Sequence, residues 1–501
     1  MPLPAPRADL MPNSFDNEVI PLVKPQGFRE YDARWVLGKE INYLGVTALG
    51  VGLGTYIHEA DVKPRVVVGH DFRSYSLNVK QALSLGLIAA GCEVLDIGLA
   101  LSPMAYFAQF DLEAPCVAMV TASHNENGWT GVKMGASPPL TFGPEEMGRL
   151  KAIVLGGEGV ERDGGRLVRV DGVMERYIAE VASRTKLTRK LRVVAACGNG
   201  TAGAFAPDAL RRMGAEVIPM DCELDWSFPK YNPNPEDHEM LQSMAEAVKR
   251  EGADLAFGFD GDGDRCGVVD ETGEEIFADK IGLMLARDLS KTHKDAKFVV
   301  DVKSTGLYAT DAVLKANGAS TLYWKTGHSY IKRKTAEIGA LAGFEKSGHF
   351  FFNAPLGRGY DDGLVAASAV LNMLERNPGK TLNQMKSELP LAYTSLTMSP
   401  HCDDDKKYGV VEQVVAEYQA MASSGGKVLG RAITEVITVN GVRVALEDGS
   451  WMLVRASSNK PELVVVVEST RSADDMRALF REEVKRRLAA HPQVGAYNQE
   501  V

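Results

Sequence analysis

The sequence predicts a multidomain α/β protein in which three similar α/β domains precede a C-terminal α+β domain. The main support is a loose repeat of short apolar runs that end in polar turns, at residues 66–71, 193–198 and 298–303. Runs that are apolar on both faces are typical of buried, mostly parallel strands. Helix-compatible sequence follows two of these runs, at 76–90 and 201–213, and alternating strands and helices indicate α/β layers. A length of 501 residues is enough for three or four domains with ample buried core.

The expected domain boundaries lie where composition changes, at the glycine-rich stretch 156–165, near 271–280 and near 390–405. We therefore predict domains at residues 1–165, 166–275, 276–392 and 393–501, with mixed or parallel sheets in the first three. Residues 1–25 are rich in proline and polar side chains, and we expect them to form a loosely held arm.

The C-terminal segment has a different pattern, with strands expected at 433–439, 451–455 and 463–468. A helix is expected from Ser472, whose side chain can cap it, and Asp475 suits the first helical turn. Apolar side chains then recur with helical spacing, at Met476, Leu479, Phe480, Val484 and Leu488. These elements predict the α+β domain.

Composition excludes several kinds of partner. The formal net charge of −10 argues against nucleic acid or an anionic membrane, although local Arg and Lys can still bind a phosphorylated substrate. The six cysteines are scattered without zinc spacing, which favours reduced thiols. There is neither a signal-peptide pattern nor an apolar run near 18 residues. We therefore expect a soluble, cytoplasmic protein.

The stretch 120–135 is the first candidate site. A strand-like apolar run at 116–120 leads into a turn that holds Ser123 and His124, with Lys133 ten residues beyond the serine. A hydroxyl at the end of a strand can act as a nucleophile if a base or a metal activates it. The alternative is an ordinary strand-to-loop turn in which serine and asparagine bond the backbone.

The stretch 255–270 is the second candidate site. Asp260, Asp262 and Asp264 alternate with glycines and precede Arg265. Two unit charges 4 Å apart repel by about 4 kcal/mol in a protein-like medium, so converging carboxylates favour a hard cation such as Mg²⁺, Mn²⁺ or Ca²⁺. An EF-hand is the competing reading, because Glu271 falls at its twelfth position. However, Arg265 stands where that loop needs glycine, and both flanks resemble strands rather than helices.

Together these two motifs resemble those of the α-D-phosphohexomutase family, with the bacterial phosphomannomutase/phosphoglucomutase enzymes as the nearest kin. Further matches follow in the family's order: FREYDARW (28–35), DVKST (301–305), WKTGHS (324–329), FEKSGHFFF (344–352) and RASSNKPELVVVVES (455–469). The resemblance implies three related α/β domains and a C-terminal α+β domain around a central cleft.

The resemblance also implies that Ser123 carries a phosphoryl group and that Mg²⁺ binds Ser123, Asp260, Asp262 and Asp264. A phosphoserine adds roughly −1.5 to −2 charge, so the site totals about −5 with the carboxylates and about −3 with one Mg²⁺. Basic side chains must supply the remainder. The candidates at motif positions are Arg34, His124, Lys133, Arg265 and Lys303.

Other motif residues are expected to bind the substrate. Glu345 and Ser347 suit the vicinal hydroxyls of a sugar, with His349 beside them, although a plain glycine turn is the alternative. His328 is expected to carry a proton or to neighbour a phosphate, and Lys133 and His328 both remain candidates for the general base. Tyr31 and Arg34 lie where the family's first domain reaches the substrate.

The C-terminal motif predicts a phosphate-binding nest, or else a plain hairpin turn, formed by Arg455, Ser457, Ser458, Asn459 and Lys460. The sequence departs from the family at three motif sites: Glu126 replaces its usual proline, Lys346 replaces methionine or glutamine, and Ser457-Ser458-Asn459 stands where the family usually has Ser-Asn-Thr. The first departure weakens the expectation of a rigid serine turn, and the second weakens any inference about which sugar binds. Arg73 is interpreted as a structural residue.

The expected activity is the interconversion of hexose 1-phosphate and hexose 6-phosphate, for mannose, glucose or both. The resemblance implies a hexose 1,6-bisphosphate as intermediate and activator, and sugar phosphates are the expected partners of a monomer or dimer. An amino-sugar phosphate mutase, for glucosamine or N-acetylglucosamine phosphate, is the alternative within the family. If the protein is not an enzyme, the alternative is a non-catalytic relative that binds sugar phosphates or a metal.

Overall fold

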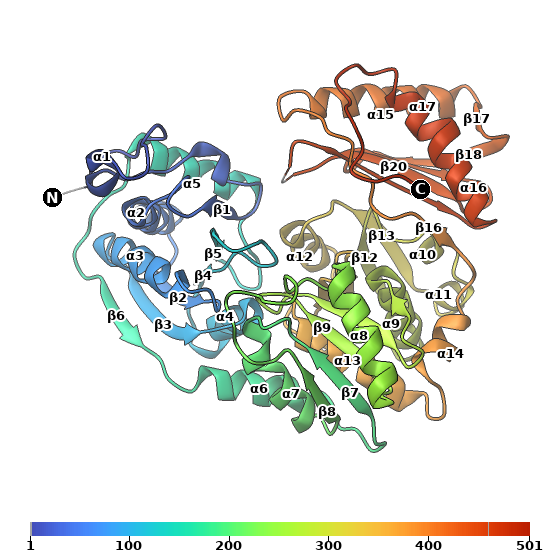
Figure 1. Cartoon of the computed structure of the whole chain (residues 1–501), viewed down its shortest axis with the longest axis horizontal. Coiled ribbons are helices and arrows are strands. Elements are labelled where there is room, and N and C mark those ends of the chain that lie inside the picture. The colour runs from blue at the N-terminus through green and yellow to red at the C-terminus, as the bar shows by residue number, and fades with distance from the viewer. Residues whose placement is uncertain (1–2, 459) are drawn as a thin grey trace. The chain divides into compact units, whose positions relative to one another are not determined.

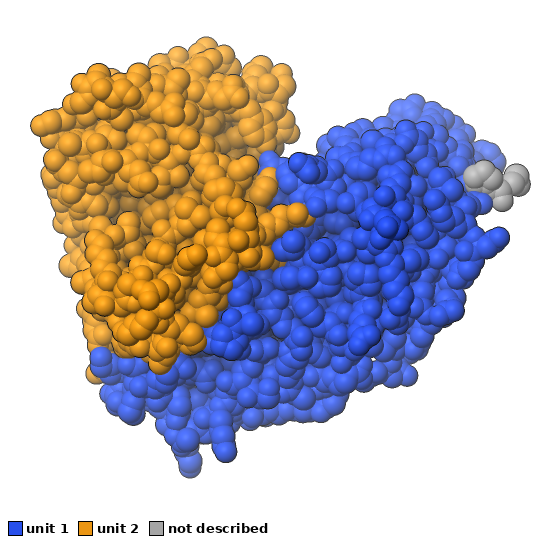
Figure 2. Space-filling view, turned by 180° about the vertical axis from the view of Figure 1, so that it is seen from behind, with its two compact units in different colours: residues 1–278, 347–383 blue, residues 279–346, 384–501 orange. Residues whose placement is uncertain are grey.

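The computed structural model describes residues 3–458 and 460–501. The chain forms two compact units, each built from two separate stretches of sequence (Figure 2). Unit 1 comprises residues 1–278 and 347–383, and unit 2 comprises residues 279–346 and 384–501. Within the described residues, none of the helices is long and apolar enough to cross a membrane.

The first sheet of unit 1 is mixed, with strand order β1-β5-β4-β2-β3-β6. β2 pairs in parallel with β3 and β4, whereas β5 runs antiparallel to β1 and β4. The elements of this region are α1 (Phe15–Val19), η1 (Pro25–Gly27), β1 (Ala33–Val36), α2 (Tyr43–Glu59), β2 (Arg65–His70), α3 (Ser76–Ala89), β3 (Glu93–Leu99), α4 (Ser102–Asp111), β4 (Cys116–Val120), β5 (Trp129–Gly135), α5 (Pro144–Gly156) and β6 (Arg166–Arg169).

Helices cover both faces of this sheet (Figure 1). Val66 and Val68 of β2 share one core with apolar side chains of α2, α3 and α5. Side chains alternate along a strand, so Val67 lies on the opposite face, where α4 contacts β2 and β4. The strand β2 is therefore apolar on both faces because it is buried between two layers of helices, as the sequence predicted.

The N-terminal arm is more firmly attached than predicted. Asn42 caps α2 with its Oδ1 and also donates its Nδ2 to the carbonyls of Asn17 and Ile20 at 2.7 and 2.9 Å. Leu22 and Val23 are fully buried. The expectation of a loose arm over residues 1–25 was wrong for this part because a half-buried side-chain amide and two buried apolar side chains fix it.

The second sheet of unit 1 has the order β11-β10-β9-β7-β8. Its elements are α6 (Val173–Ser183), β7 (Arg192–Ala196), η2 (Thr201–Ala204), α7 (Ala206–Arg212), β8 (Glu216–Met220), α8 (His238–Glu251), β9 (Leu255–Phe259), β10 (Cys266–Asp270) and β11 (Glu275–Ile276). The helix expected at 201–213 is interrupted at Phe205, which separates a 3₁₀ turn from α7. The returning stretch 347–383 adds β15 (Phe350–Phe352) and α13 (Gly363–Arg376), and α13 packs on α6, α7 and β10.

Unit 2 begins with a parallel group in which β12 pairs with β13 and β14. Its elements are α9 (Ala278–Thr292), β12 (Lys297–Asp301), α10 (Leu307–Thr310), α11 (Ala312–Ala316), β13 (Ser320–Trp324), α12 (His328–Glu337), β14 (Ala342–Phe344) and α14 (Leu382–Ser387). Most of α9 and α14 belongs to this unit.

The C-terminal sheet is antiparallel, with the order β16-β21-β20-β19-β18-β17. Its elements are β16 (Tyr393–Thr394), α15 (Lys407–Ser423), β17 (Lys427–Val428), β18 (Arg431–Ile437), β19 (Val442–Leu446), β20 (Trp451–Ala456), β21 (Leu463–Ser469), α16 (Ala473–Ala478), the π-helical turn η3 (Leu479–Lys485) and α17 (Arg486–Leu488). The three expected strands and the Ser472 cap are confirmed, since Ser472 accepts from the backbone N–H of Asp475. The sequence reading had missed β19.

A buried polar network joins this sheet to the parallel group within unit 2. Glu468 accepts hydrogen bonds from Thr305 Oγ1 at 3.0 Å and from Trp451 Nε1 at 2.8 Å. Arg443 donates to the carbonyls of Val302 and Ser304 at 2.6 and 2.8 Å, and its guanidinium stacks on Trp451. A buried network in which the partners satisfy one another rigidifies its surroundings. The network therefore holds the C-terminal sheet against the turn that follows β12.

Candidate active site

Ser123 lies in the turn after β4, with a left-handed backbone (φ 50°) and only 1% of its surface exposed. Its Oγ donates to Asp260 Oδ2 at 2.9 Å, and His124 Nδ1 lies 3.3 Å away. A non-glycine residue in this conformation costs energy that the surroundings must offset. The structure therefore brings the two sequence motifs together at one buried serine–carboxylate contact.

A network from the loop after β2 supports this turn. Arg73 donates one nitrogen to the Ser123 carbonyl at 2.9 Å and to the Asn125 carbonyl at 2.7 Å, and its other terminal nitrogen pairs with Asp71. Asp71 also accepts from Thr121 Oγ1 at 2.9 Å. Arg73 and Asp71 are both buried, so the network is shielded from solvent. Arg73 thus supports the serine turn, and Asp71 and Thr121 are positioning residues that the sequence reading missed.

Asp260, Asp262 and Asp264 are fully buried between β9 and β10, with ligand atoms within 4.8 Å of one another. Gly261 permits this packing, because a Cβ there would lie 2.4 Å from the Ser123 carbonyl oxygen. Burial, together with the charges of Asp262 and Asp264, raises the pKa of Asp260 to about 8. Among the described residues no donor reaches Asp262 Oδ1. Converging, incompletely satisfied carboxylates fit a hard metal ion.

The EF-hand alternative is wrong. That motif places its loop between two helices, whereas β9 and β10 form an antiparallel pair around this loop. The expectation that both flanks are strands is confirmed.

Lys133, on β5, supplies positive charge to the carboxylates. Its Nζ is 2.6 Å from Asp262 Oδ2 and also pairs with Asp264. Burial opposes the charged ammonium, but Asp262 and Asp264 outweigh it and raise the pKa of Lys133. Lys133 therefore keeps its proton while these pairs hold. Ser102, at the start of α4, donates to Asp262 Oδ2 at 2.5 Å and is a further residue that the sequence reading missed.

Arg34 and His124 lie beside the serine turn. Arg34 donates to Asp32 at 2.8 Å and to Asn125 Oδ1 at 2.9 Å. Burial and the nearby guanidiniums of Arg265 and Arg34 lower the pKa of His124 well below its usual value. His124 is therefore neutral at physiological pH and contributes no net charge. Tyr31 is also buried in this unit, near the start of β1.

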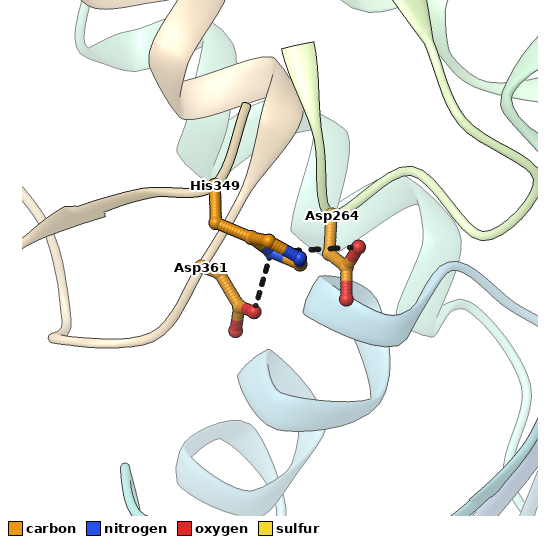
Figure 3. A group of neighbouring side chains, drawn as sticks. All are labelled: Asp264, His349 and Asp361. Carbon is orange, nitrogen blue, oxygen red and sulfur yellow. Dashed lines mark ion pairs between the residues drawn. The ribbon is translucent and has the colours of Figure 1, made fainter. Parts of the chain in front are cut away.

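His349 links Asp264 of the metal loop, the stretch 260–265 that carries the three aspartates, to Asp361, as Figure 3 shows. Its Nδ1 is 3.0 Å from Asp361 and 3.7 Å from Asp264, and its Nε2 accepts from Arg265 Nε at 3.0 Å. Asp264, His349 and Asp361 thus form a second buried cluster of titratable side chains. Because Nε2 accepts the hydrogen bond from Arg265, the imidazole of His349 carries its proton on Nδ1, which faces the carboxylates. Asp361 was missed, although an Asp-Asp pair ahead of α13 was a visible signal.

Three sequence motifs converge in unit 2. Asp301 accepts from Ser304 Oγ at 2.6 Å, from Thr326 Oγ1 at 3.1 Å and from the Lys346 backbone N–H at 3.3 Å. Glu345 Oε1 accepts from the Gly327 N–H at 2.5 Å. These bonds gather the turns that carry Lys303, His328 and Glu345, which are all buried.

The departure at Lys346 also lies among these turns, directly after Glu345 in the same motif. Burial, partly offset by Asp279 and Glu468, lowers the pKa of Lys346. Ser347, the next residue of the motif, is half-buried and belongs to unit 1.

The C-terminal motif forms the turn between β20 and β21. Arg455 is 7% exposed and donates to the Ala456 carbonyl at 2.8 Å. Ser457 closes the hairpin through its N–H to Glu462 O at 3.0 Å, and its Oγ accepts from the Lys460 N–H at 3.3 Å. Ser458 is half-buried and Lys460 is exposed. Asn459 lies outside the described residues, and phosphate binding by this turn stays a prediction.

Models of one protein family match the chain in four successive pieces. Phosphoglucomutase/phosphomannomutase alpha/beta/alpha domains I, II and III match residues 25–159, 175–273 and 277–393, and the C-terminal domain matches residues 402–486. The chain is 33% identical to the phosphomannomutase/phosphoglucomutase of Pseudomonas putida, over 93% of this chain and 97% of that protein. It is 32% identical to the phosphoglucomutase of Neisseria gonorrhoeae, over 89% of this chain and 93% of that protein.

A solved structure of the same family is also similar to this chain. The phosphoglucomutase/phosphomannomutase family protein of Burkholderia thailandensis superposes with a TM-score of 0.83 at 29% identity, over 95% of this chain and 99% of that one. The four-domain fold and the buried serine–carboxylate site define an enzyme of the phosphohexomutase class. More narrowly, the chain belongs to the phosphoglucomutase/phosphomannomutase family.

Proposed function

We propose that the protein interconverts hexose 1-phosphate and hexose 6-phosphate, with mannose, glucose or both as the sugar. In this proposal Ser123 carries the phosphoryl group and transfers it to the free hydroxyl end of the substrate. The resulting 1,6-bisphosphate turns end for end and returns its other phosphate to Ser123. The observation that supports this most is the 2.9 Å contact between Ser123 Oγ and Asp260 inside a buried cluster of carboxylates and basic side chains.

The chain's own residues supply much of the electrostatics. Asp260, Asp262 and Asp264 would hold Mg²⁺, which when bound would neutralise charge on the transferring oxygens. Arg265 and Lys133 add fixed positive charge from buried positions, where such charge acts more strongly than in water. Arg34 and His124 lie beside the turn, and Arg73 positions it. Burial of the whole cluster excludes water, which would otherwise hydrolyse a phosphoserine.

A base must accept the proton of the attacking hydroxyl, and Lys133 and His328 are the candidates. The two carboxylate partners of Lys133 raise its pKa and oppose that role while the pairs hold. We propose that Glu345, Ser347 and His349 bind the sugar together with Tyr31 and Lys303. The turn of Arg455, Ser457, Ser458, Asn459 and Lys460 would bind the phosphate that is not being transferred.

The decisive experiment combines intact-mass analysis with a substrate panel. Wild-type protein should contain a phosphorylated fraction that maps to the peptide with Ser123, and Ser123→Ala should lose both that mass and nearly all turnover. Ser84→Ala removes another buried serine hydroxyl and should leave both unchanged. A Ser123→Ala variant with undiminished turnover would overturn the mechanism.

The panel contains mannose 1-phosphate, glucose 1-phosphate, glucosamine 1-phosphate and N-acetylglucosamine 1-phosphate, with Mg²⁺ and a trace of hexose 1,6-bisphosphate. Preference for either amino sugar would replace the proposed substrate with the alternative within the family. Failure of all four, with Ser123 unphosphorylated, would indicate a non-catalytic relative. We further propose that the protein acts in the cytoplasm as a monomer or dimer, which light scattering would test.

A further inference from the structure

Two thiols in unit 1 lie in contact at the ends of neighbouring strands. Cys197 directly follows β7, and Cys222 lies two residues beyond β8. The two strands pair in parallel up to Ala196 and Met220, so both cysteines emerge at the same edge of the sheet. Their Sγ atoms are 3.5 Å apart, and both cysteines are present as free thiols. A disulfide needs a separation of about 2.0 Å, so a shift of roughly 1.5 Å would join them.

We propose that Cys197 and Cys222 form an oxidation site that a peroxide converts into a reversible intramolecular disulfide. The Cys222 thiolate attacks one peroxide oxygen, which breaks the O–O bond, forms Cys222–SOH and releases hydroxide. The Cys197 sulfur then attacks the Cys222 sulfur, which forms the S–S bond and expels hydroxide. That hydroxide takes the Cys197 proton and leaves as water. The two thiols lose two electrons, and the peroxide gains them.

The surroundings divide these roles between the two cysteines. Cys222 is half-buried, whereas Cys197 is fully buried. The contact with Cys197 lowers the pKa of Cys222, and the same contact, with burial, raises the pKa of Cys197. An accessible thiol with a lowered pKa is the one that reacts first with a peroxide. Cys197 is then placed to resolve the sulfenic acid.

The other cysteines lack this combination. Cys92, Cys116, Cys266 and Cys402 are all buried. Burial raises the pKa of Cys92 to about 11 and that of Cys116 to about 12. Thiols of this kind are unreactive. These four buried cysteines therefore serve as internal controls, because selective oxidation of Cys197 and Cys222 should leave them unmodified.

The pair also lies next to the candidate active site. Thr201, four residues after Cys197, donates its N–H to the Gly261 carbonyl at 3.3 Å, and its Oγ1 accepts from the Phe72 N–H at 2.9 Å. Gly203 packs against the Cys222 carbonyl, where a Cβ would lie at 2.1 Å. Closing the disulfide would pull on the turn that contacts both the metal loop and the Arg73 loop. We therefore expect the disulfide to reduce turnover. The disulfide itself does not depend on the proposed function, whereas this loss of turnover does.

The test exposes the full-length protein to a small excess of hydrogen peroxide, followed by alkylation and peptide mapping without reductant. We expect a linked peptide that contains Cys197 and Cys222, a mass loss of two hydrogens, and full reversal by dithiothreitol. Cys222→Ser should abolish the linkage, and Cys402→Ser should leave it unchanged. Cys197→Ala should leave Cys222 as a trapped sulfenic acid that dimedone labels.

Two results would overturn the proposal. One is a wild-type protein in which Cys222 proceeds to sulfinic acid without any linkage to Cys197. The other is equal dimedone labelling of Cys222 in the wild type and in Cys197→Ala. If the linkage forms and reverses while turnover stays constant, the link to catalysis is refuted although the oxidation site stands. If substrate turnover is absent even in reduced protein, the proposed function fails independently of the disulfide.

Discussion

Replacing Arg73 with lysine tests whether the network around Asp71 maintains the serine turn. Arg73 holds the carbonyls of Ser123 and Asn125 at 2.9 and 2.7 Å while pairing with Asp71 through its other terminal nitrogen. A lysine ammonium keeps the charge but cannot reproduce a planar fork with separate nitrogens for these partners. The substitution should therefore remove at least one charge-assisted hydrogen bond.

Such a bond contributes about 1.5–3 kcal/mol, and about 1.4 kcal/mol corresponds to a tenfold change in an equilibrium. Ser123 has a left-handed backbone that already costs energy, so the turn should leave its active conformation when this support weakens. We expect Arg73→Lys to reduce kcat/KM for glucose 1-phosphate by roughly 10- to 100-fold.

The assay is the initial rate of glucose 6-phosphate formation, combined with hydrogen exchange of the peptide spanning 121–127. That peptide should exchange faster in Arg73→Lys, because the two carbonyl contacts maintain its local order. Arg149→Lys is the matched control: Arg149 also pairs with carboxylates, Glu59 and Glu158, but on the surface. Wild-type kcat/KM together with wild-type exchange in Arg73→Lys would refute the reasoning.

Three further predictions concern the metal loop and the C-terminal turn. Asp262→Asn should weaken Mg²⁺ binding, measured by titration calorimetry, by about tenfold or more, because it removes one of three buried anionic ligands; unchanged Mg²⁺ affinity would contradict the assigned site. EDTA should abolish turnover and Mg²⁺ should restore it, whereas Ca²⁺ should restore it poorly because its looser coordination suits phosphoryl transfer badly. Arg455→Ala should raise KM by roughly 10- to 100-fold with Mg²⁺ binding and Ser123 phosphorylation retained. Arg471→Ala, on the surface of the same domain, is its control, and an unchanged KM and kcat in Arg455→Ala would leave that turn a simple hairpin.

The features that the sequence predicted well are those with local signals. The strands around the Asp260 loop could be anticipated from apolar runs, and the Ser472 helix start from capping chemistry. That Ser123 and Asp260 belong to one site was implied by the resemblance of their two motifs to a known family, and their side chains are in contact. In each case the relevant residues are neighbours in the sequence or belong to a recognisable motif.

The features that the sequence did not predict depend on contacts between distant segments. Nothing near Arg73 indicates that it reaches the carbonyls of Ser123 and Asn125, about fifty positions away. The pairing of His349 with Asp361 depends on how the chain returns after β15. The N-terminal arm was read as loose because its proline-rich composition carries no sign of the bonds from Asn42.

The path of the chain through its two compact units has a consequence for biosynthesis. Unit 1 is interrupted by residues 279–346 and is completed only by residues 347–383, which include α13. At translation rates of roughly 5–20 residues per second, the ribosome spends several seconds on the interruption. During that interval the surfaces of α6 and α7 that α13 covers remain exposed on the nascent chain. Exposed apolar surface of this kind recruits chaperones or aggregates, so a ribosome-stalled chain ending before Gly363 should require chaperone assistance that the full-length protein no longer needs.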